Sequence, residues 1–378
     1  MSLTPELLER YFEIYNFTNE IIDLDNEKMF LIQPNAFRNC RRKRKIRSLR
    51  LQIENNDYHK EIALKRKHSS LFEPLKKHLE ELDVTCILEC EFNFLKHLKN
   101  LRKLKINLNS IRIGRPLFIE AKNQLTHLDL TYCKLPDKTM FNDLKCLKHL
   151  ILSHVTIDLN VLPDLFSELK QLDTLTMNGT ELNLTDNAFI HLANLRELCI
   201  ENYGIPEECL NVLAPLKSLQ KLVMSSTKAF NYKAFKHVND LRELKLQKFS
   251  MIQIDETFFD QHPNLESLAL SSLNSSDNQC DKYVTNCSEL KTLVNLKSTL
   301  KSLDLSDNNY LYLEQDCEAI FRFANLEILN LSLTYSNELF KERQLKLNET
   351  TFEKMTNLRV LNLSGNQIKL EGNCFKHL

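Results

Sequence analysis

His127 and His149 are the residues of this sequence whose type and spacing come closest to metal chemistry. Each occupies the same place in a short pattern, L-x-H-L, so the two imidazoles would lie side by side if that pattern forms neighbouring strands. Protein zinc sites combine imidazole with further Cys, His or carboxylate ligands, and the sequence offers no such support at a specific spacing. We therefore expect no metal site.

The motifs of common enzyme classes do not occur in the sequence. It contains no glycine-rich phosphate loop, no G-x-S-x-G and no H-E-x-x-H. Its five glycines also argue against loops that cradle phosphates. We expect no catalytic residue and no cofactor, and we interpret the chain as a non-enzymatic protein.

The cysteines could pair or bind metal. There are 11, an odd number, so at least one thiol is free or pairs outside the chain. The closest pairs are Cys86 with Cys90 and Cys280 with Cys287, and neither has further ligands at zinc-finger spacing. We expect most of the cysteines to be small buried hydrophobic residues.

N-x-S/T sequons are candidates for glycosylation if the chain is secreted. The possible acceptors are Asn178, Asn183, Asn274, Asn286 and Asn348. Further sequons stand at Asn16, Asn330 and Asn362. A sugar at Asn330 or Asn362 would obstruct the predicted binding surface. The alternative is that the motifs arise without modification, because a repeated pattern of this chain itself contains N-L-S.

Charge gives little direction for the chain as a whole, because 50 Lys and Arg balance 50 Asp and Glu. The strongest cluster is the run RRKRK at residues 41–45, which could bind a polyanion or act as a nuclear-localisation signal, or could be a solvated turn before a strand. No window approaches 18 uninterrupted apolar residues, so we expect no membrane span in this chain.

A repeated pattern, L-x-x-L-x-L, must position all of these residues. It begins at Leu101, Leu125, Leu147, Leu172, Leu195, Leu219, Leu241, Leu265, Leu300, Leu326 and Leu358. The steps from Leu101 to Leu265 are 24, 22, 25, 23, 24, 22 and 24 residues. These steps fall within the range of about 20–29 residues that is typical of leucine-rich repeats. More degraded units begin at Ile46 and Leu79, and Ile22–Leu24 resembles part of a first one.

Side chains alternate along a strand, which assigns each position of the unit to a face. Counting from the first leucine, the fourth and sixth positions point inward, and the third and fifth point outward. Stacked units bury a shared core that no single unit could bury alone. The pattern predicts an α/β leucine-rich repeat solenoid, a curved horseshoe with a parallel β-sheet on its concave face and short helices, 3-10 turns and loops on its convex face.

Phenylalanines indicate a second buried row on the convex side. One often stands six or seven residues before the first leucine of the next repeat. These residues are Phe94, Phe141, Phe166, Phe189, Phe235, Phe259 and Phe352.

The domain organisation follows from the repeats. We expect an N-terminal lead-in at residues 1–18 and a repeat domain of about fourteen units at residues 19–378. The last segment stops where the next strand should start, so we expect the domain to be truncated at its C-terminal end. Two steps are long, at 35 and 32 residues. Their extra segments, near residues 274–286 and 334–348, are expected to be loops.

Two units resemble the "typical" subclass of leucine-rich repeats. They are LRVLNLSGNQI, which starts at Leu358, and LKSLDLSDN, which starts at Leu300. Similar units occur in Toll-like receptor ectodomains and other extracellular proteins, so the resemblance implies protein or ligand recognition outside the cell. It identifies no particular binding residue, and the cysteine-rich caps usual in those proteins are not seen in this sequence.

The outward positions are the predicted partner-binding surface. They are Lys103, Lys105, His127, Asp129, His149, Ile151, Thr174, Thr176, Glu197, Cys199, Lys221, Val223, Glu243 and Lys245. Their mixed charge favours a protein partner over a nucleic acid, which would favour a uniformly basic stripe.

Two functions from different classes stay open. The first is a receptor-like or secreted recognition module, located outside the cell or at its surface. The second is an intracellular adaptor in the cytoplasm, such as the substrate receptor of a ubiquitin ligase. The odd number of cysteines favours the second, because disulfides are rare in the cytosol. A structural member of a larger array, with no ligand of its own, is a third possibility.

Overall fold

The computed structural model describes residues 21–24, 46–53, 73–86, 98–112, 124–135, 138–157, 162–179, 184–201, 205, 208–225, 232–248, 258–272, 292–296, 298–308, 320–333 and 344–378. The chain forms two compact units. Unit 1 comprises Met1–Leu182 and Phe189–Asn194, and unit 2 comprises Asn183–Ala188 and Leu195–Leu378. The predicted lead-in at 1–18, the basic run at 41–45 and the loop at 274–286 lie outside the described residues.

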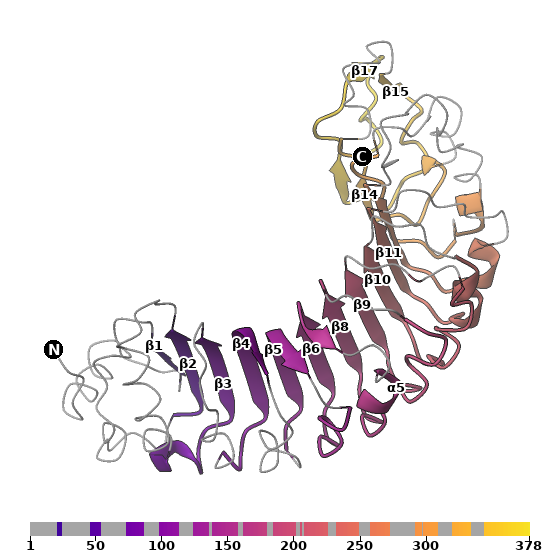
Figure 1. Cartoon of the computed structure of the whole chain (residues 1–378). Helices are drawn as coiled ribbons and strands as arrows, with labels where there is room; N and C mark the ends of the chain where they lie inside the picture. The colour runs from indigo at the N-terminus through magenta and orange to yellow at the C-terminus, as the bar shows by residue number, and fades with distance from the viewer. Residues whose placement is uncertain are drawn as a thin grey trace, which may run out of the picture. The chain divides into compact units, whose positions relative to one another are not determined.

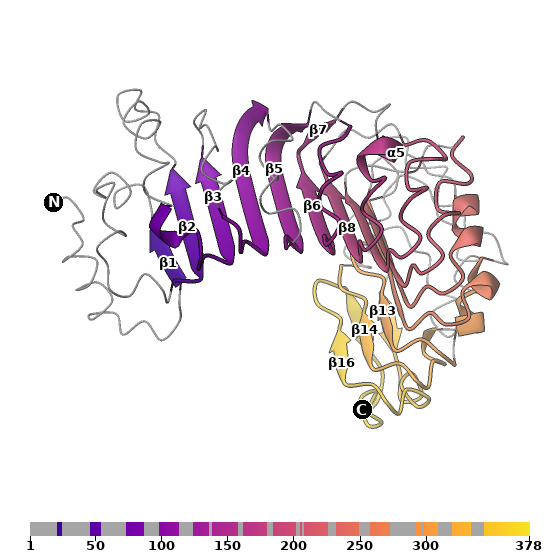
Figure 2. The ribbon, with the colours of Figure 1, turned by 90° about the horizontal axis from the view of Figure 1, so that it is seen from below.

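Unit 1 is built on a parallel β-sheet whose strands follow the order of the sequence (Figure 1, and from below in Figure 2). The strands are β1 (Ile21–Leu24), β2 (Ser48–Ile53), β3 (Glu81–Cys86), β4 (Lys103–Arg112), β5 (His127–Leu135), β6 (His149–Ser153) and β8 (Thr174–Asn178). The short β7 (Thr156–Ile157) pairs with the end of β5. Between the strands stand a 3-10 helix at Glu73–Leu75 and the short helix α5 (Leu162–Leu165).

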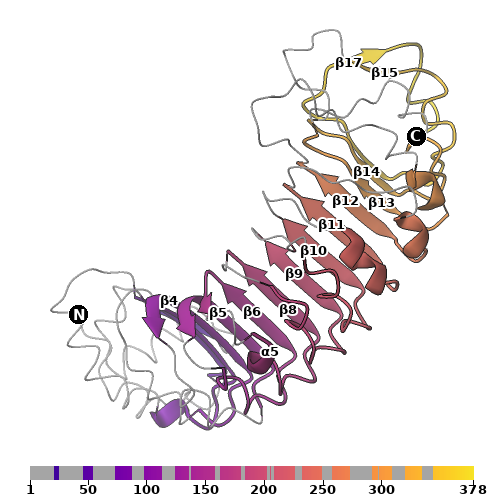
Figure 3. The ribbon, with the colours of Figure 1, turned by 45° about the vertical axis from the view of Figure 1, so that its right-hand side comes forward.

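Unit 2 repeats the same arrangement (Figure 3). Its sheet contains β9 (Glu197–Glu201), β10 (Lys221–Ser225), β11 (Glu243–Gln247), β12 (Ser267–Ser271), β13 (Ser302–Asp304), β14 (Ile328–Asn330) and β16 (Val360–Asn362). A separate pair joins β15 (Leu345–Leu347) to β17 (Ile368–Leu370). The 3-10 helices are Tyr232–His237, Phe259–Gln261 and Thr292–Leu296. The predicted parallel sheet and solenoid fold class are thereby confirmed.

The strands pair in the register of the repeat, so that each position of one repeat lies beside the same position of the next repeat. In β5 and β6, for example, His127 pairs with His149 and Leu128 with Leu150. The first, fourth and sixth positions form the core. Leu147, Leu150 and Leu152 are all 0% exposed. Each such leucine contributes about 2 kcal/mol by leaving water, which makes this register far more stable than a shifted one.

The predicted phenylalanine row is confirmed within each unit. In unit 1 Phe141, Phe166 and Phe189 are fully buried. In unit 2 Phe235, Phe259 and Phe352 are fully buried, and the structure adds Phe323 to the series. Phe94 lies outside the described residues. These rings fill the space between the sheet and the turns, so the absence of tryptophan leaves no gap in the core.

Asparagines satisfy backbone carbonyls at two places in the unit. At the ninth position, Asn308 donates to the carbonyls of Leu270 at 2.6 Å and Leu305 at 2.8 Å. Asn366 makes the equivalent pair of bonds two repeats later. A second row precedes the first leucine, where Asn100 donates to the carbonyl of Lys77 at 2.6 Å. The same bond to the preceding repeat is made by Asn194, Asn325 and Asn357. The second row was not predicted from the sequence.

The eighth position adopts a left-handed backbone. The residues found there with positive φ are Tyr132, His154, Gly179, Lys248, Ser272, Asp307, Leu333 and Gly365. The reason is a lateral hydrogen bond. The His154 amide donates to the carbonyl of Asn178 at 2.7 Å, and the Leu333 amide donates to that of Ser364 at 2.9 Å. A residue with a Cβ accepts this conformation at a cost of about 1 kcal/mol, which the continued ladder offsets.

We predict that Asn308→Ala lowers the free energy of unfolding by about 2 kcal/mol, because it withdraws a buried donor from two carbonyls. Asn308 is only 2% exposed, so water cannot replace the amide. Asn264→Ala is the matched control, since Asn264 is exposed, and its effect should stay below about 0.5 kcal/mol. Urea unfolding followed by circular dichroism measures both. Equal losses would contradict the role of the buried amide.

His262 occupies a core position that is leucine in other units, such as Leu144 and Leu192, and it is 0% exposed. Its ring meets Phe258 edge to face, with centroids 5.0 Å apart. Burial lowers the pKa of His262 to about 4, and a contact with the backbone of Val238 only partly offsets this. The folded state therefore holds a neutral imidazole at neutral pH.

We predict that this buried imidazole makes the chain sensitive to acid. Between the ordinary pKa of about 6.5 and the folded pKa of about 4, the unfolded chain binds the proton and the folded chain does not. Stability should therefore fall as pH drops through that window, by up to about 3 kcal/mol. His262→Leu should remove this part of the fall, whereas His191→Gln, at an exposed site, should keep it. Urea unfolding at several pH values is the measurement, and an unchanged pH slope in His262→Leu would refute the assignment.

Candidate functional site

The candidate site is the side of each sheet that faces away from the buried leucines. We call it the open face, and it carries the third and fifth positions of every unit. The alternation of buried and part-exposed residues along β5, β6, β8 and β11 shows this division directly. Because the register aligns equal positions, the third positions form one row across the strands and the fifth positions form another.

The structure places all of the predicted partner-binding residues on these strands. In unit 1 they stand on four strands, in the pairs Lys103 and Lys105 (β4), His127 and Asp129 (β5), His149 and Ile151 (β6), and Thr174 and Thr176 (β8). In unit 2 they are Glu197 and Cys199 (β9), Lys221 and Val223 (β10), and Glu243 and Lys245 (β11). One departs from expectation. Val223, expected to be an exposed apolar contact, is only 8% exposed. Cys199 and Lys245 stand beside it on the neighbouring strands, so it offers little surface.

Ion pairs between neighbouring strands neutralise the first half of the unit 1 face. In the third-position row, Lys103 Nζ lies 2.7 Å from Glu81 Oε1. In the fifth-position row, Arg50 Nε lies 3.2 Å from Asp83 Oδ2, and Lys105 Nζ lies 3.8 Å from Asp129 Oδ2. Exposed pairs such as these contribute at most about 1 kcal/mol each. Their main effect is to avoid like charges in register.

The sequence predicted that His127 and His149 lie side by side, and in the structure their rings stack. The rings of His127 and His149 have centroids 4.1 Å apart and planes 26° apart. His127 Nδ1 lies 2.9 Å from Thr126 Oγ1, and His149 Nδ1 lies 2.8 Å from Thr174 Oγ1. Both rings are thus held through Nδ1, which leaves the two Nε2 atoms available to a partner.

Stacking makes this pair a poor metal chelate, and His127 within it has a lowered pKa. A metal ion lies near the plane of each imidazole that binds it, so two rings stacked face to face cannot share one ion without turning. Burial lowers the pKa of His127, and the nearby His149, Lys103 and Lys148 lower it further, while Glu81 acts in the opposite direction. The described residues contain no group of three or more His, Cys, Asp or Glu that could hold a metal ion.

Beyond the histidines the unit 1 face becomes uncharged and rich in hydroxyls. Ile151 pairs with Thr176 in register, and His149 pairs with Thr174. Asp129 accepts a hydrogen bond from Thr131 Oγ1 at 3.1 Å. Burial raises the pKa of Asp129, and its contacts with Thr131 and Lys105 offset part of this shift. Ile151 thus lies between the Asp129 carboxylate of β5 and the Thr176 hydroxyl of β8, and it offers an apolar contact within a polar surface.

Three features of the unit 1 surface were not among the predicted residues. Arg102 and Lys148 precede the strands β4 and β6, and both are exposed. Tyr132, which is 47% exposed, stacks flat on His154 with centroids 4.7 Å apart and planes 6° apart. Gly179 is next in that row, and a Cβ built on it would overlap the His154 ring. The positions were visible in the repeat, but the sequence alone did not show that they lie at the edge of the open face.

In unit 2 the open face is also ion-paired, with Lys221 Nζ 3.1 Å from Glu243 Oε2. Burial raises the pKa of Cys199 to about 12, and Glu201 adds to this. A thiol that stays protonated at neutral pH is a weak nucleophile, which argues against a reactive role for Cys199. The prediction that cysteines are buried holds for Cys133, Cys209 and Cys374.

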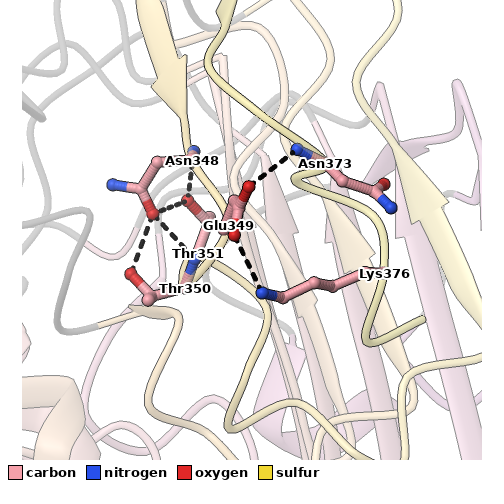
Figure 4. Close-up of polar contacts among 6 residues, drawn as sticks. All are labelled: Asn348, Glu349, Thr350, Thr351, Asn373 and Lys376. Atoms are coloured by element: carbon pink, nitrogen blue, oxygen red, sulfur yellow. Dashed lines mark hydrogen bonds and ion pairs between the residues drawn. The ribbon is translucent and has the colours of Figure 1, made fainter.

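Among the predicted glycosylation sites, Asn178 ends strand β8 and Asn348 follows β15, while Asn183, Asn274 and Asn286 lie outside the described residues. Asn348 is exposed, and its Oδ1 accepts bonds from the Thr350 amide at 2.9 Å and hydroxyl at 2.8 Å (Figure 4). The neighbouring Glu349 accepts a bond from Lys376 Nζ at 3.0 Å (Figure 4).

The sequons of the open face have a structural purpose. Asn330 Oδ1 accepts from the amide and hydroxyl of Ser332, and Asn362 does the same with Ser364. Asp304 accepts from the Ser306 amide at 2.9 Å in the equivalent place, where no sequon exists. The N-L-S motif therefore closes the end of the strand at both of these sequons.

Comparison with protein families points to the same repeat. Residues 205–306 match, in six copies, a family model described as "BspA type Leucine rich repeat region". Residues 354–372 match a model described as "Leucine Rich repeat". These matches confirm the predicted resemblance to leucine-rich repeat proteins. The comparison with curated proteins gives no match. None of the helices in the described part of the chain is long and apolar enough to cross a membrane.

Solved structures share the fold at low sequence identity. The structure described as the TLR13–ssRNA13 complex aligns with a TM-score of 0.53 and 21% identity over 92% of this chain and 48% of that one. An internalin (inlF) from Listeria monocytogenes aligns with a TM-score of 0.50 and 18% identity, over 77% of this chain and 82% of that one. The chain thus spans about half the length of the first of these proteins.

We predict that His149→Ala raises the pKa of His127 toward its ordinary value of about 6.5. The change removes both a ring that covers His127 and a nearby group that can carry positive charge. Titration of the histidine C–H resonances by NMR measures this. His154→Ala, which removes an imidazole stacked elsewhere on the same strands, is the control and should leave His127 unchanged. A His127 pKa that stays low in His149→Ala would show that the stack is not the cause.

Proposed function

We propose that this chain, a leucine-rich repeat solenoid, is a recognition module that binds a protein partner on its open face. The observation that carries the proposal is the composition of the unit 1 face over β5, β6 and β8. There Ile151 and Thr176 lie beside a stacked histidine pair, next to rows of charges that are already neutralised within the sheet.

The mechanism is rigid display. Each exposed side chain stands on a strand held on both sides by backbone bonds, so a partner meets a surface that loses little conformational freedom on binding. The uncharged centre can be desolvated at low cost, and the paired lysines and carboxylates around it would act as a polar rim that sets orientation.

Several observations support a receptor-like or secreted protein, located outside the cell or at its surface. Asn348, the acceptor residue of one sequon, is exposed, and its amide oxygen accepts a hydrogen bond from the Thr350 hydroxyl. The repeats resemble those of extracellular proteins, and one structure with the same fold is named as a Toll-like receptor with single-stranded RNA. That ligand belongs to that protein. The paired charges of this face favour a protein partner here.

The second candidate is an intracellular adaptor. It is favoured by the thiols Cys146, Cys209 and Cys374, which are free in the structure. Cys209 donates to the carbonyl of Leu184 at 2.9 Å, so its sulfur is engaged as a thiol within the core. Buried reduced cysteines are common in cytosolic proteins. Glycan mass on the protein from its native source would favour the first candidate, and its absence together with reduced thiols would favour the second.

We predict that Ile151→Arg abolishes capture of the natural partner. The immobilised full chain is incubated with the secreted and the cytosolic fractions of its source, and bound proteins are identified by mass spectrometry. The arginine would replace an apolar contact with a longer, charged side chain beside Asp129 of β5, which should weaken binding at least about tenfold.

Lys170→Glu is the matched control, because Lys170 is exposed in the turn before β8 and is not on the open face. It should capture the partner as the original chain does. A partner that binds Ile151→Arg as well as the original chain would overturn the open face as the binding site.

A further inference from the structure

Basic side chains gather at the beginning of three consecutive strands in unit 1. In the three repeats that contain these strands, the second and third positions are Arg102 and Lys103, Thr126 and His127, and Lys148 and His149. Register places Lys103 beside His127 and His127 beside His149. Neighbouring strands are about 4.8 Å apart, so the three strands together span about 10 Å. We call Arg102, Lys103, His127, Lys148 and His149 the basic patch.

Three of the carboxylates around this patch are already paired with a cation, one of them with Lys103 of the patch itself. On the β3 side, Glu80 pairs with Arg47 at 3.3 Å and Glu81 pairs with Lys103 at 2.7 Å. In the fifth-position row, Asp129 pairs with Lys105 at 3.8 Å. On the β8 side, Asp173 follows Lys148 in the second-position row and donates its amide to the Lys148 carbonyl at 2.8 Å.

The cations of the patch are not neutralised to the same degree. Among the described residues neither Arg102 nor Lys148 has an ion pair, and both side chains are exposed. His127 and His149 add positive charge when they are protonated. The patch therefore has an excess of positive charge already at neutral pH, and the excess grows as pH falls.

The histidines are arranged to present this charge outward. Thr126 Oγ1 donates to the Arg102 carbonyl at 3.2 Å and so accepts from Nδ1–H of His127. Thr174 holds His149 through its Nδ1. When a ring is protonated both of its nitrogens are donors, so each Nδ1 can stay bonded to its threonine while the Nε2–H is available to a partner. Two such donors about one strand spacing apart match the oxygens of carboxylate groups.

We infer that the basic patch at the beginning of β4, β5 and β6 binds an acidic segment of a protein partner, and binds it more tightly at mildly acidic than at neutral pH. This rests on the proposed function and specifies the chemistry of the partner. An acidic group beside the stack favours the protonated imidazoles, so binding takes up protons and strengthens as pH falls.

The extent of the patch favours an acidic protein segment over a nucleic acid. Glu80 and Glu81 bound it on one side, and Asp173 with Thr174 bounds it on the other. A phosphate polymer gains affinity from many contacts along a basic track, and it would run into these carboxylates. Two or three carboxylates of one short segment fit within the three strands.

The test measures binding of a short fluorescent peptide of alternating glutamate and serine to the full chain by fluorescence anisotropy, at pH 7.4 and pH 5.5. We expect the dissociation constant to be about fivefold lower at pH 5.5, because two additional exposed charge pairs would each contribute a modest binding free energy. The double variant His127→Gln and His149→Gln keeps side chains that can hydrogen-bond but cannot be protonated. It should lose the pH dependence and retain the affinity seen at pH 7.4.

Two matched controls separate the patch from general charge. His154→Gln removes an exposed imidazole at the other end of β6 and should keep the fivefold pH dependence. Arg102→Gln with Lys148→Gln should weaken binding at both pH values at least about threefold, whereas Lys134→Gln, an exposed lysine at the far end of β5, should not.

Each contrary result has a distinct meaning. Absence of peptide binding by the original chain, or equal binding by the Arg102 and Lys148 double variant, overturns the inference. Tighter binding of a single-stranded oligonucleotide through the same residues overturns it in favour of a phosphate polymer.

If Ile151→Arg abolishes partner capture while patch variants leave capture and peptide binding unchanged, the inference fails and the proposed function stands. If Ile151→Arg has no effect on capture, the proposed function fails, and the peptide result alone decides the patch.

Discussion

The register of the parallel strands is the constraint on which everything else in this molecule depends. It is fixed by the leucines at the first, fourth and sixth positions, which are buried only when equal positions of neighbouring units lie side by side. The same alignment then applies to the outward side chains, which have no choice of neighbour. Charges of one sign would repel one another along a whole row. In unit 1 the charges alternate instead, with Glu81 beside Lys103 in the third-position row and Lys105 beside Asp129 in the fifth-position row. Where the alternation ends, the imidazoles of His127 and His149 stack.

The backbone imposes a second requirement, since each unit leaves amides and carbonyls at both ends of its strand. The amides of Thr126 and His127 both donate to the Arg102 carbonyl, and equivalent bonds recur from unit to unit. At the other end the left-handed eighth position carries the ladder one residue further, and buried asparagines such as Asn308 satisfy the carbonyls that remain. Together these bonds make the open face a fixed surface. Binding there depends on which side chains the strands carry and hardly at all on rearrangement.

Most of the fold could be predicted from the sequence, because it follows from a short pattern repeated at nearly constant spacing. Every predicted unit from Ile46 to Leu358 supplies a strand that begins at its third position, and the phenylalanine row lies where its spacing indicated. The placement of outward residues was equally predictable. Their environments were not. Val223 is covered by side chains of the neighbouring repeats. The stack of Tyr132 on His154 depends on a left-handed backbone that a hydrophobic pattern does not encode. The asparagines before the first leucine were also missed, because their partners are carbonyls of the preceding repeat.

The contact between His154 and Gly179 has a consequence for how this protein can change over generations. The imidazole occupies the space that a Cβ at residue 179 would need, and the left-handed backbone at that residue also favours glycine. A side chain can therefore be tolerated at 179 only after the ring at 154 has been lost or displaced, and losing that ring uncovers the phenol of Tyr132. The three positions should consequently vary together among relatives of this chain, in a preferred order of substitution, even though each belongs to a different repeat and none of them lies in the leucine core.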